Sequence, residues 1–170
     1  MHLYLAHPDT AIGINLQPRY VFCGKGFSMN EISGRCKCGN IELRGSIRDD
    51  SLEITPRVCG CNFCRQNKAV YLSDTQGSVE FRFKDKEKVK IHKQGSGLAN
   101  FIICKSCGSF IGVTYDSGDE IFATLNLNLL NDLPPLQAPE ASIPGNEAVD
   151  DKVKRWQHMW FKSVKLGGLT

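Results

Sequence analysis

Apolar and polar residues alternate along several short segments of this chain, a pattern typical of half-buried β-strands. The clearest segment is 81–93, where Phe81, Phe83, Val89 and Ile91 share one predicted face. The other face carries a basic row, Arg82, Lys84, Lys86, Lys88, Lys90 and His92. A turn near Asp85-Lys86 could interrupt this strand. The row could bind an anionic ligand or nucleic acid, but lysines on a solvated or edge strand also discourage edge-to-edge association, and we favour that interpretation.

Other segments with strand-forming residues lie on either side of residues that favour turns. The segment 32–46 predicts a hairpin with its bend at Cys38-Gly39-Asn40. Further strands are expected over 52–58, 100–103, 110–115 and 120–127. Their order and short connections predict a mainly β fold of antiparallel sheets.

The C-terminal third departs from this pattern. Four prolines between residues 131 and 146 exclude a long regular element and predict a surface crossing or loop; they are Pro134, Pro135, Pro139 and Pro144. A short C-terminal helix is expected next, capped by Asp150-Asp151. Its apolar face would hold Val153, Trp156, Trp160 and Val164. We expect both tryptophans to pack against the sheet rather than stack on a ligand.

Seven of the eight cysteines fall into three tight clusters at predicted strand ends or bends. The clusters are Cys36 and Cys38; Cys59, Cys61 and Cys64; and Cys104 and Cys107. Such spacing is typical of metal ligation, because thiolate zinc sites take four ligands drawn from short local pairs. Seven cysteines are more than the four ligands of one tetrahedral site and fewer than the eight ligands of two such sites. One closed site of four and one open site of three are therefore expected.

The two outer pairs are the natural candidates for the closed site. In an extended segment, residues i and i+2 face the same way, so Cys36 and Cys38 can aim at one metal. Cys104 and Cys107 can do the same from a tight turn ending in Gly108. A structural zinc held by these four cysteines would tie the first hairpin to a late strand and organise the sheets around it.

The middle cluster supplies three ligands, Cys59, Cys61 and Cys64, and three protein ligands with one vacant position are typical of a catalytic zinc. Nearby Arg65 and Lys68 could support thiolate charge or meet a substrate carboxylate. Alternatively, both sites are structural, or Cys23 completes the open site. A redox role for Cys61 and Cys64 is disfavoured, because that motif is expected in a βαβ setting.

Composition limits the class of protein. The chain has 170 residues and 41% hydrophobic content, enough for one globular domain with a core. A net charge of +3 is too small to indicate a nucleic-acid partner. No apolar run approaches the ~18 residues of a membrane span. Closely spaced cysteines suit chelation better than disulfides, so we expect a reducing, cytoplasmic location.

Residues 1–28 lack the basic start and apolar core of a secretory signal. We expect an N-terminal extension over 1–28, which contains Cys23, and a single zinc-binding domain over 29–170.

The cysteine segments 34–39, 59–65 and 103–109 together resemble, in order and spacing, the three signatures of the glutathione-dependent formaldehyde-activating enzyme family. The resemblance spans about residues 32–160 and fills all seven ligand positions. It implies a mainly antiparallel β fold with a structural zinc at the four outer cysteines, and a catalytic zinc at Cys59, Cys61 and Cys64.

The activity implied by this resemblance is that of a carbon-sulfur lyase. Glutathione, the thiol partner, and formaldehyde, a small aldehyde, would combine reversibly to S-(hydroxymethyl)glutathione. No general acid is obvious near the three cysteines; His92 and Tyr115 are candidates only by residue type. The alternative is a non-catalytic zinc-binding interaction module that binds a partner through the basic segment 82–92.

Two positions differ from many relatives. Gly60 replaces a histidine between the first two cysteines of the middle cluster, and Ala141-Ser142 replace a later histidine. The ligand set is retained, whereas the surroundings of the substrate are expected to differ.

Overall fold

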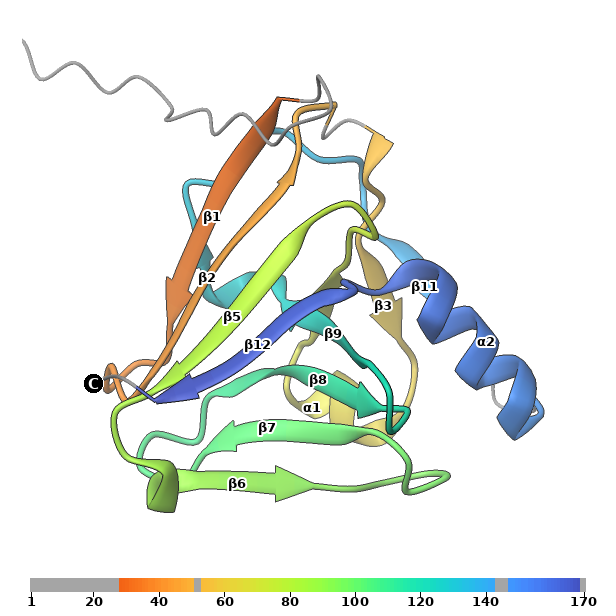
Figure 1. Ribbon diagram of the computed structural model, residues 1–170. Helices are drawn as coiled ribbons and strands as arrows, with labels where there is room; N and C mark the ends of the chain where they lie inside the picture. Colours follow the sequence, from red (N-terminus) through yellow and green to blue (C-terminus); the bar gives the residue numbers. More distant parts are fainter. Residues whose placement is uncertain (1–27, 51–52, 143–146, 169–170) are drawn as a thin grey trace, which may run out of the picture.

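The computed structural model describes residues 28–50, 53–142 and 147–168 of the chain. The predicted extension lies, except for Ser28, outside the described residues, as does Cys23. Among the described residues, two sheets and two α-helices account for the regular structure, apart from short 3₁₀ turns (Figure 1). The prediction of a mainly β fold with a short C-terminal helix is confirmed.

The first sheet has five strands in the order β10-β1-β2-β5-β12. They are β1 (Met29–Arg35), β2 (Ile41–Arg48), β5 (Ser78–Phe83), β10 (Leu130–Asn131) and β12 (Ser163–Gly168). Strands β1 and β2 form the predicted antiparallel hairpin, with the first cysteine pair in its bend. Strand β12 pairs in parallel with β5, an arrangement that the sequence did not indicate.

The second sheet has seven strands in the order β11-β3-β4-β9-β8-β7-β6. They are β3 (Arg57–Cys59), β4 (Val70–Leu72), β6 (Val89–His92), β7 (Asn100–Cys104), β8 (Phe110–Asp116), β9 (Ile121–Asn126) and β11 (Glu140–Ser142). The strands expected over 100–103, 110–115 and 120–127 are confirmed. The strand expected over 52–58 is shorter, with only its last residues in β3. Most pairings are antiparallel, but β11 runs parallel to β3.

The main core lies between the two sheets. Leu43 and Phe81 from the first sheet pack in one buried cluster with Ile102 and Ile111 from the second. The neighbouring residues Phe101 and Phe110 belong to a second buried cluster. Side chains alternate across a strand, so β7 and β8 bury both faces. This explains their continuous apolar runs, and the second cluster is where the middle cysteines lie.

The segment 81–93 is not one strand. A turn at the predicted place contains the 3₁₀ segment Lys86–Lys88, and β5 and β6 belong to different sheets. The expected common apolar face is therefore wrong: Phe81 is fully buried, whereas Ile91 is 50% exposed on the edge strand β6.

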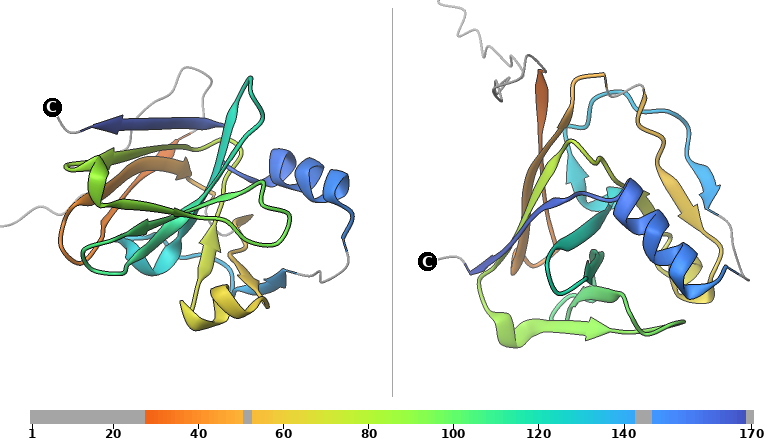
Figure 2. Two further views of the ribbon diagram at one scale, coloured as in Figure 1. Left: turned by 90° about the horizontal axis from the view of Figure 1, so that it is seen from below. Right: turned by 45° about the vertical axis from the view of Figure 1, so that its right-hand side comes forward.

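Helix α1 (Asn62–Gln66) carries Cys64, and α2 (Val149–Met159) lies on the β3 side of the molecule (Figures 1 and 2). Trp156 of α2 belongs to the same buried cluster as Cys64. Asp150 and Asp151 stand in the first turn of α2, while Ala148 occupies the cap position without a side-chain hydrogen bond. The prediction that these aspartates cap the helix is wrong. No helix within the described ranges is long and apolar enough to cross a membrane.

The helix also ends earlier than its apolar pattern predicts. Phe161, fully buried, exchanges two backbone hydrogen bonds with Ala123 of β9, at 2.9 and 3.0 Å. This bridge draws the chain into an extended conformation after Met159. Val164 consequently lies in β12 and not on the helix.

Candidate metal centres and an adjoining cavity

Each outer cysteine pair lies in a turn that is closed by a glycine, three residues after Cys36 in the first turn and four residues after Cys104 in the second. The N–H of Gly39 donates to the carbonyl of Cys36, and that of Gly108 to the carbonyl of Cys104, each at 2.9 Å. Both glycines have positive φ, +73° and +71°, a conformation that side chains with a Cβ rarely adopt. Each glycine therefore closes a turn that directs two sulfurs to one side.

These turns bring four sulfurs together. All of their Sγ atoms lie within 4.8 Å of one another. Cys38 Sγ is 3.6 Å from Cys36 Sγ and 3.5 Å from Cys104 Sγ. Four sulfurs at ~2.3 Å from a tetrahedral zinc would be ~3.8 Å apart, so the donor set and spacing fit that ion. We call Cys36, Cys38, Cys104 and Cys107 the four-cysteine cluster.

Ser109 supports this cluster from the second turn. Its hydroxyl lies 3.2 Å from Cys107 Sγ and accepts the N–H of Lys37, so it contacts both turns. Partial desolvation opposes ionisation of Cys107, but hydrogen bonds from the side chain and backbone of Ser109, together with others from Cys38 and Cys104, lower the pKa to about 6. Cys36 and Cys104 are almost fully buried. The cluster is thus built into the edge of the core.

The middle cysteines form a second group, the trio of Cys59, Cys61 and Cys64. Their sulfurs also lie within 4.8 Å of one another. Cys59 ends β3, Cys61 is the N-cap of α1, and its Sγ accepts the N–H of Cys64 at 3.4 Å. A short strand followed at once by a helix turn therefore gathers three thiols from six residues.

The pKa values of two thiols in the trio are shifted in opposite directions. A hydrogen bond from Cys64 is the main cause that lowers the pKa of Cys59 to about 5, and the charge of Arg155 acts in the same direction. The same hydrogen bond, together with burial, raises the pKa of Cys64. Cys59 therefore ionises more readily than Cys64, and the charge of Arg155 favours the Cys59 thiolate.

Two residues that the sequence analysis missed contact the trio. The hydroxyl of Tyr71 on β4 lies 2.9 Å from Cys64 Sγ, and Gln94 Nε2 donates to Cys61 Sγ at 3.4 Å. Burial raises the pKa of Tyr71, with the Cys64 charge as the next cause, so its hydroxyl stays protonated. No sequence signal marked either residue, because both come close only through strand pairing and a distant loop.

The trio opens into a cavity of about 600 Å³. All three cysteines, Gly60, Tyr71 and Gln94 line it. An apolar wall is made by Ala99, Phe101, Val113, Trp156, Met159 and Trp160, and the polar residues Ser73, Ser96 and Thr124 also line the cavity. None of the four-cysteine cluster is among the described residues that line this cavity. Only the trio therefore faces this cavity, although Cys38 of the four-cysteine cluster is exposed on the surface.

Three cations also line the cavity: Arg57, Lys152 and Arg155. Two are held by carboxylates, Arg57 by Glu140 at 2.9 Å and Arg155 by Glu147 through two hydrogen bonds of 2.8 and 2.9 Å. The buried Nε of Arg57 has no hydrogen-bond partner among the described atoms. The cavity therefore combines thiols with positive charge, a setting suited to an anionic thiol ligand.

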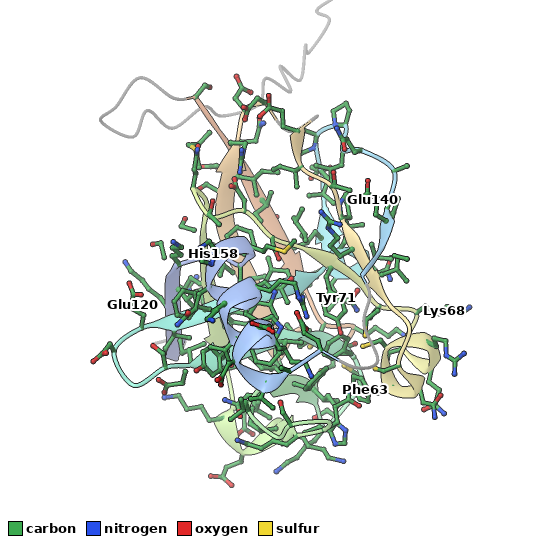
Figure 3. The ribbon with its side chains drawn as sticks, turned by 90° about the vertical axis from the view of Figure 1, so that its right-hand side faces the viewer. Phe63, Lys68, Tyr71, Glu120, Glu140 and His158 are labelled. Atoms are coloured by element: carbon green, nitrogen blue, oxygen red, sulfur yellow. The ribbon has the colours of Figure 1, made fainter. Side chains whose placement is uncertain are left out.

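The cations and acids suggested by the sequence lie elsewhere. Arg65 and Lys68 are exposed and do not line the cavity, and Figure 3 shows Lys68 pointing outward, away from Tyr71. His92 stacks on Phe63 at 5.0 Å, and Tyr115 stacks on Phe122. Neither aromatic residue lines the cavity, so the suggested roles for these four residues near a substrate are not supported.

Trp156 packs against the sheet, and both tryptophans line the cavity. Trp156 packs against Tyr115 of β8 at 5.4 Å, as expected for a residue that covers the sheet. It also stacks on Trp160 at 4.9 Å, and both line the cavity. The expectation of packing is confirmed for Trp156, but both indole rings are also placed to meet a ligand.

The setting of Cys61 and Cys64 also bears on a redox role. The pair does stand at the start of a helix, yet β3 and β4 on either side of α1 run antiparallel. The βαβ arrangement associated with such redox pairs is therefore missing here, as the sequence analysis predicted.

One protein family matches most of the chain. The sequence profile of the glutathione-dependent formaldehyde-activating enzyme family matches residues 31–144. No curated protein matches the chain. A crystal structure of a Rhodobacter sphaeroides protein is similar at 22% identity, with a TM-score of 0.45, covering 65% of this chain and 99% of that one. The family match spans both cysteine groups, and the chain belongs to the glutathione-dependent formaldehyde-activating enzyme family.

Proposed function

We propose that the protein is a zinc-dependent carbon-sulfur lyase whose active centre is the trio. Cys59, Cys61 and Cys64 would hold a catalytic zinc, and the four-cysteine cluster a structural one. The observation that carries this proposal is the unequal access of the two groups: only the trio lines the 600 Å³ cavity. Catalytic zinc sites keep a position open to substrate, whereas structural sites are closed by four protein ligands.

The proposed reaction is the reversible addition of glutathione to formaldehyde. The sulfur forms a bond to the carbonyl carbon, the C=O π bond breaks, and the thiol proton ends on the oxygen, which gives S-(hydroxymethyl)glutathione. Zinc, when bound by the trio, would supply positive charge that stabilises the substrate thiolate at neutral pH. The reverse reaction breaks the same carbon-sulfur bond.

The chain's own residues would bind and orient the reactants. Tyr71 and Gln94 fix the positions of two cysteine sulfurs through the hydrogen bonds described above. Arg57, Lys152 and Arg155 would meet the carboxylates of glutathione. The apolar wall would exclude water around the reacting atoms.

The alternative, a non-catalytic module, depends on a continuous basic surface over residues 82–92. The basic row that would bind a partner is divided between two sheets. The segment therefore does not present one continuous positive face.

Exchange spectroscopy by NMR tests the proposed reaction directly. Zinc-loaded protein should accelerate exchange between free glutathione and its formaldehyde adduct. Cys59→Ser should abolish the acceleration, whereas Arg65→Ala, which changes an exposed cation outside the cavity, should retain it. Wild-type protein that neither accelerates exchange nor binds glutathione would overturn the proposal.

A further inference from the structure

The wall of the cavity is more apolar than glutathione and formaldehyde require. Glutathione is charged at both ends, and formaldehyde has one carbon, so neither offers an extended apolar surface. Yet six apolar residues line the cavity, including both tryptophans and Phe101. A volume of 600 Å³ falls in the range of about 300–1,000 Å³ that is typical of sites enclosing a whole organic ligand.

The apolar wall is an ordered surface. The rings of Trp156 and Trp160 are stacked with an interplanar angle of 20°. Phe101 is 8% exposed and stacks on Phe110 of the neighbouring strand β8. Flat aromatic surfaces held in this way gain contact with alkyl or aryl groups at little cost in side-chain entropy.

Gly60 leaves space beside the sulfurs. It lies between Cys59 and Cys61 and lines the cavity, and a Cβ at this position would meet no atom within 4 Å. A group attached to the carbon next to the substrate sulfur would therefore not be blocked by this residue.

We propose that the cavity takes thiol adducts whose aldehyde-derived group is apolar and larger than hydroxymethyl, such as an alkyl or aryl chain. This inference rests on the proposed function and names its substrate class. Cleavage of such a hemithioacetal breaks the carbon-sulfur bond, forms the C=O bond of the larger aldehyde, and moves the hydroxyl proton to the sulfur. The cations would hold the thiol's carboxylates, and the apolar wall would hold the aldehyde-derived group.

The chain carries its own probe for this proposal, because its two tryptophans both line the cavity. Zinc-loaded protein would be titrated with stable thioethers, S-methylglutathione, S-hexylglutathione and S-benzylglutathione, and followed by tryptophan fluorescence. Each fully buried methylene is worth about fourfold in affinity. Partial burial of the longer groups should therefore make S-hexylglutathione bind at least about tenfold more tightly than S-methylglutathione.

Variants test whether the apolar wall causes the preference for S-hexylglutathione over S-methylglutathione. Trp160→Ala should reduce it several-fold, while Trp156 still reports binding. Val149→Ala changes an exposed residue of α2 outside the cavity and should leave the preference unchanged. Met159→Ser, measured by calorimetry, provides a second test of the wall should Trp160→Ala not fold.

The outcomes separate this proposal from the proposed function. Equal affinities for the methyl and hexyl thioethers would overturn the inference, even with glutathione-formaldehyde exchange still accelerated. A hexyl preference that both Trp160→Ala and Met159→Ser leave intact would also overturn it. Failure of glutathione exchange, together with a retained hexyl preference, would instead count against the proposed function alone.

Discussion

The four-cysteine cluster and the trio use the same side chain in opposite ways. In the first, two glycine-closed turns from distant strands meet, and none of the four cysteines lines the cavity. In the second, one strand end and one helix start supply all three thiols, and each lines a cavity. A closed set of ligands ties parts of the chain together, whereas an open local set leaves room for a substrate.

The largest expected effect comes from breaking the closed set. Cys36→Ser should lower Tm by roughly 10 °C or more, because loss of a structural zinc ligand removes folding free energy outright. Cys59→Ser should change Tm far less while abolishing adduct exchange. Circular dichroism melting of both variants checks this. Equal destabilisation by the two substitutions would contradict the distinction between the groups.

Removal of metal should also distinguish the trio from the four-cysteine cluster. A chelator should first lower the zinc content from about two ions per chain to about one, because three protein ligands hold zinc less completely than four. Adduct exchange should disappear in this first phase, with near-native circular dichroism retained. Mass spectrometry of the native protein, followed over time, measures both phases. Loss of fold in step with the first ion would contradict the assignment.

Tyr71→Phe should give an intermediate effect confined to the trio. It removes the hydroxyl 2.9 Å from Cys64 Sγ, and loss of such a ligand-supporting group typically costs 10–100-fold in metal affinity or activity. The free energy of unfolding should fall by only about 1 kcal/mol. Competition with a zinc indicator reports the affinity. Ser109→Ala, which alters the other group, serves as the control and should leave the trio's affinity unchanged.

The smallest effect concerns Glu147, which binds Arg155 beside the trio. The hydrogen bonds from Arg155 hold the pKa of this carboxyl below its ordinary value of 4.5. Because the folded pKa is depressed, the pair stabilises the fold above pH 4.5, and this contribution is lost as pH falls through the folded pKa.

Glu147→Gln should therefore cost about 1 kcal/mol or less at neutral pH and remove this part of the acid dependence. Urea unfolding of both proteins at several pH values tests the prediction. A variant that keeps the full acid dependence would show that another carboxyl is responsible.

The sequence predicted those features that depend on local pattern. The hairpin around Cys36 and Cys38 followed from strand residues on either side of a turn, and the grouping of the cysteines followed from their spacing. The cysteine groups could be predicted because each turn fixes the direction of its own sulfurs.

Features that depend on distant pairing could not be predicted. Nothing local to Val70–Leu72 indicates that Tyr71 reaches Cys64, and the acids that hold Arg57 and Arg155 are identified only in three dimensions. The helical spacing of Trp156, Trp160 and Val164 was misleading for a similar reason. The bridge between Phe161 and Ala123 ends the helix, and that contact depends on a strand far away in sequence.

The separation of the ligands along the chain has a consequence for folding order. Cys38 and Cys104 are 66 residues apart, so the four-cysteine cluster forms only when a long loop closes, at an entropic cost that rises with loop length. The trio needs only the end of β3 and the first turn of α1. During synthesis, its thiols can meet metal while the later strands have yet to emerge from the ribosome. The centre that we expect to stabilise the finished fold is thus the later one to assemble.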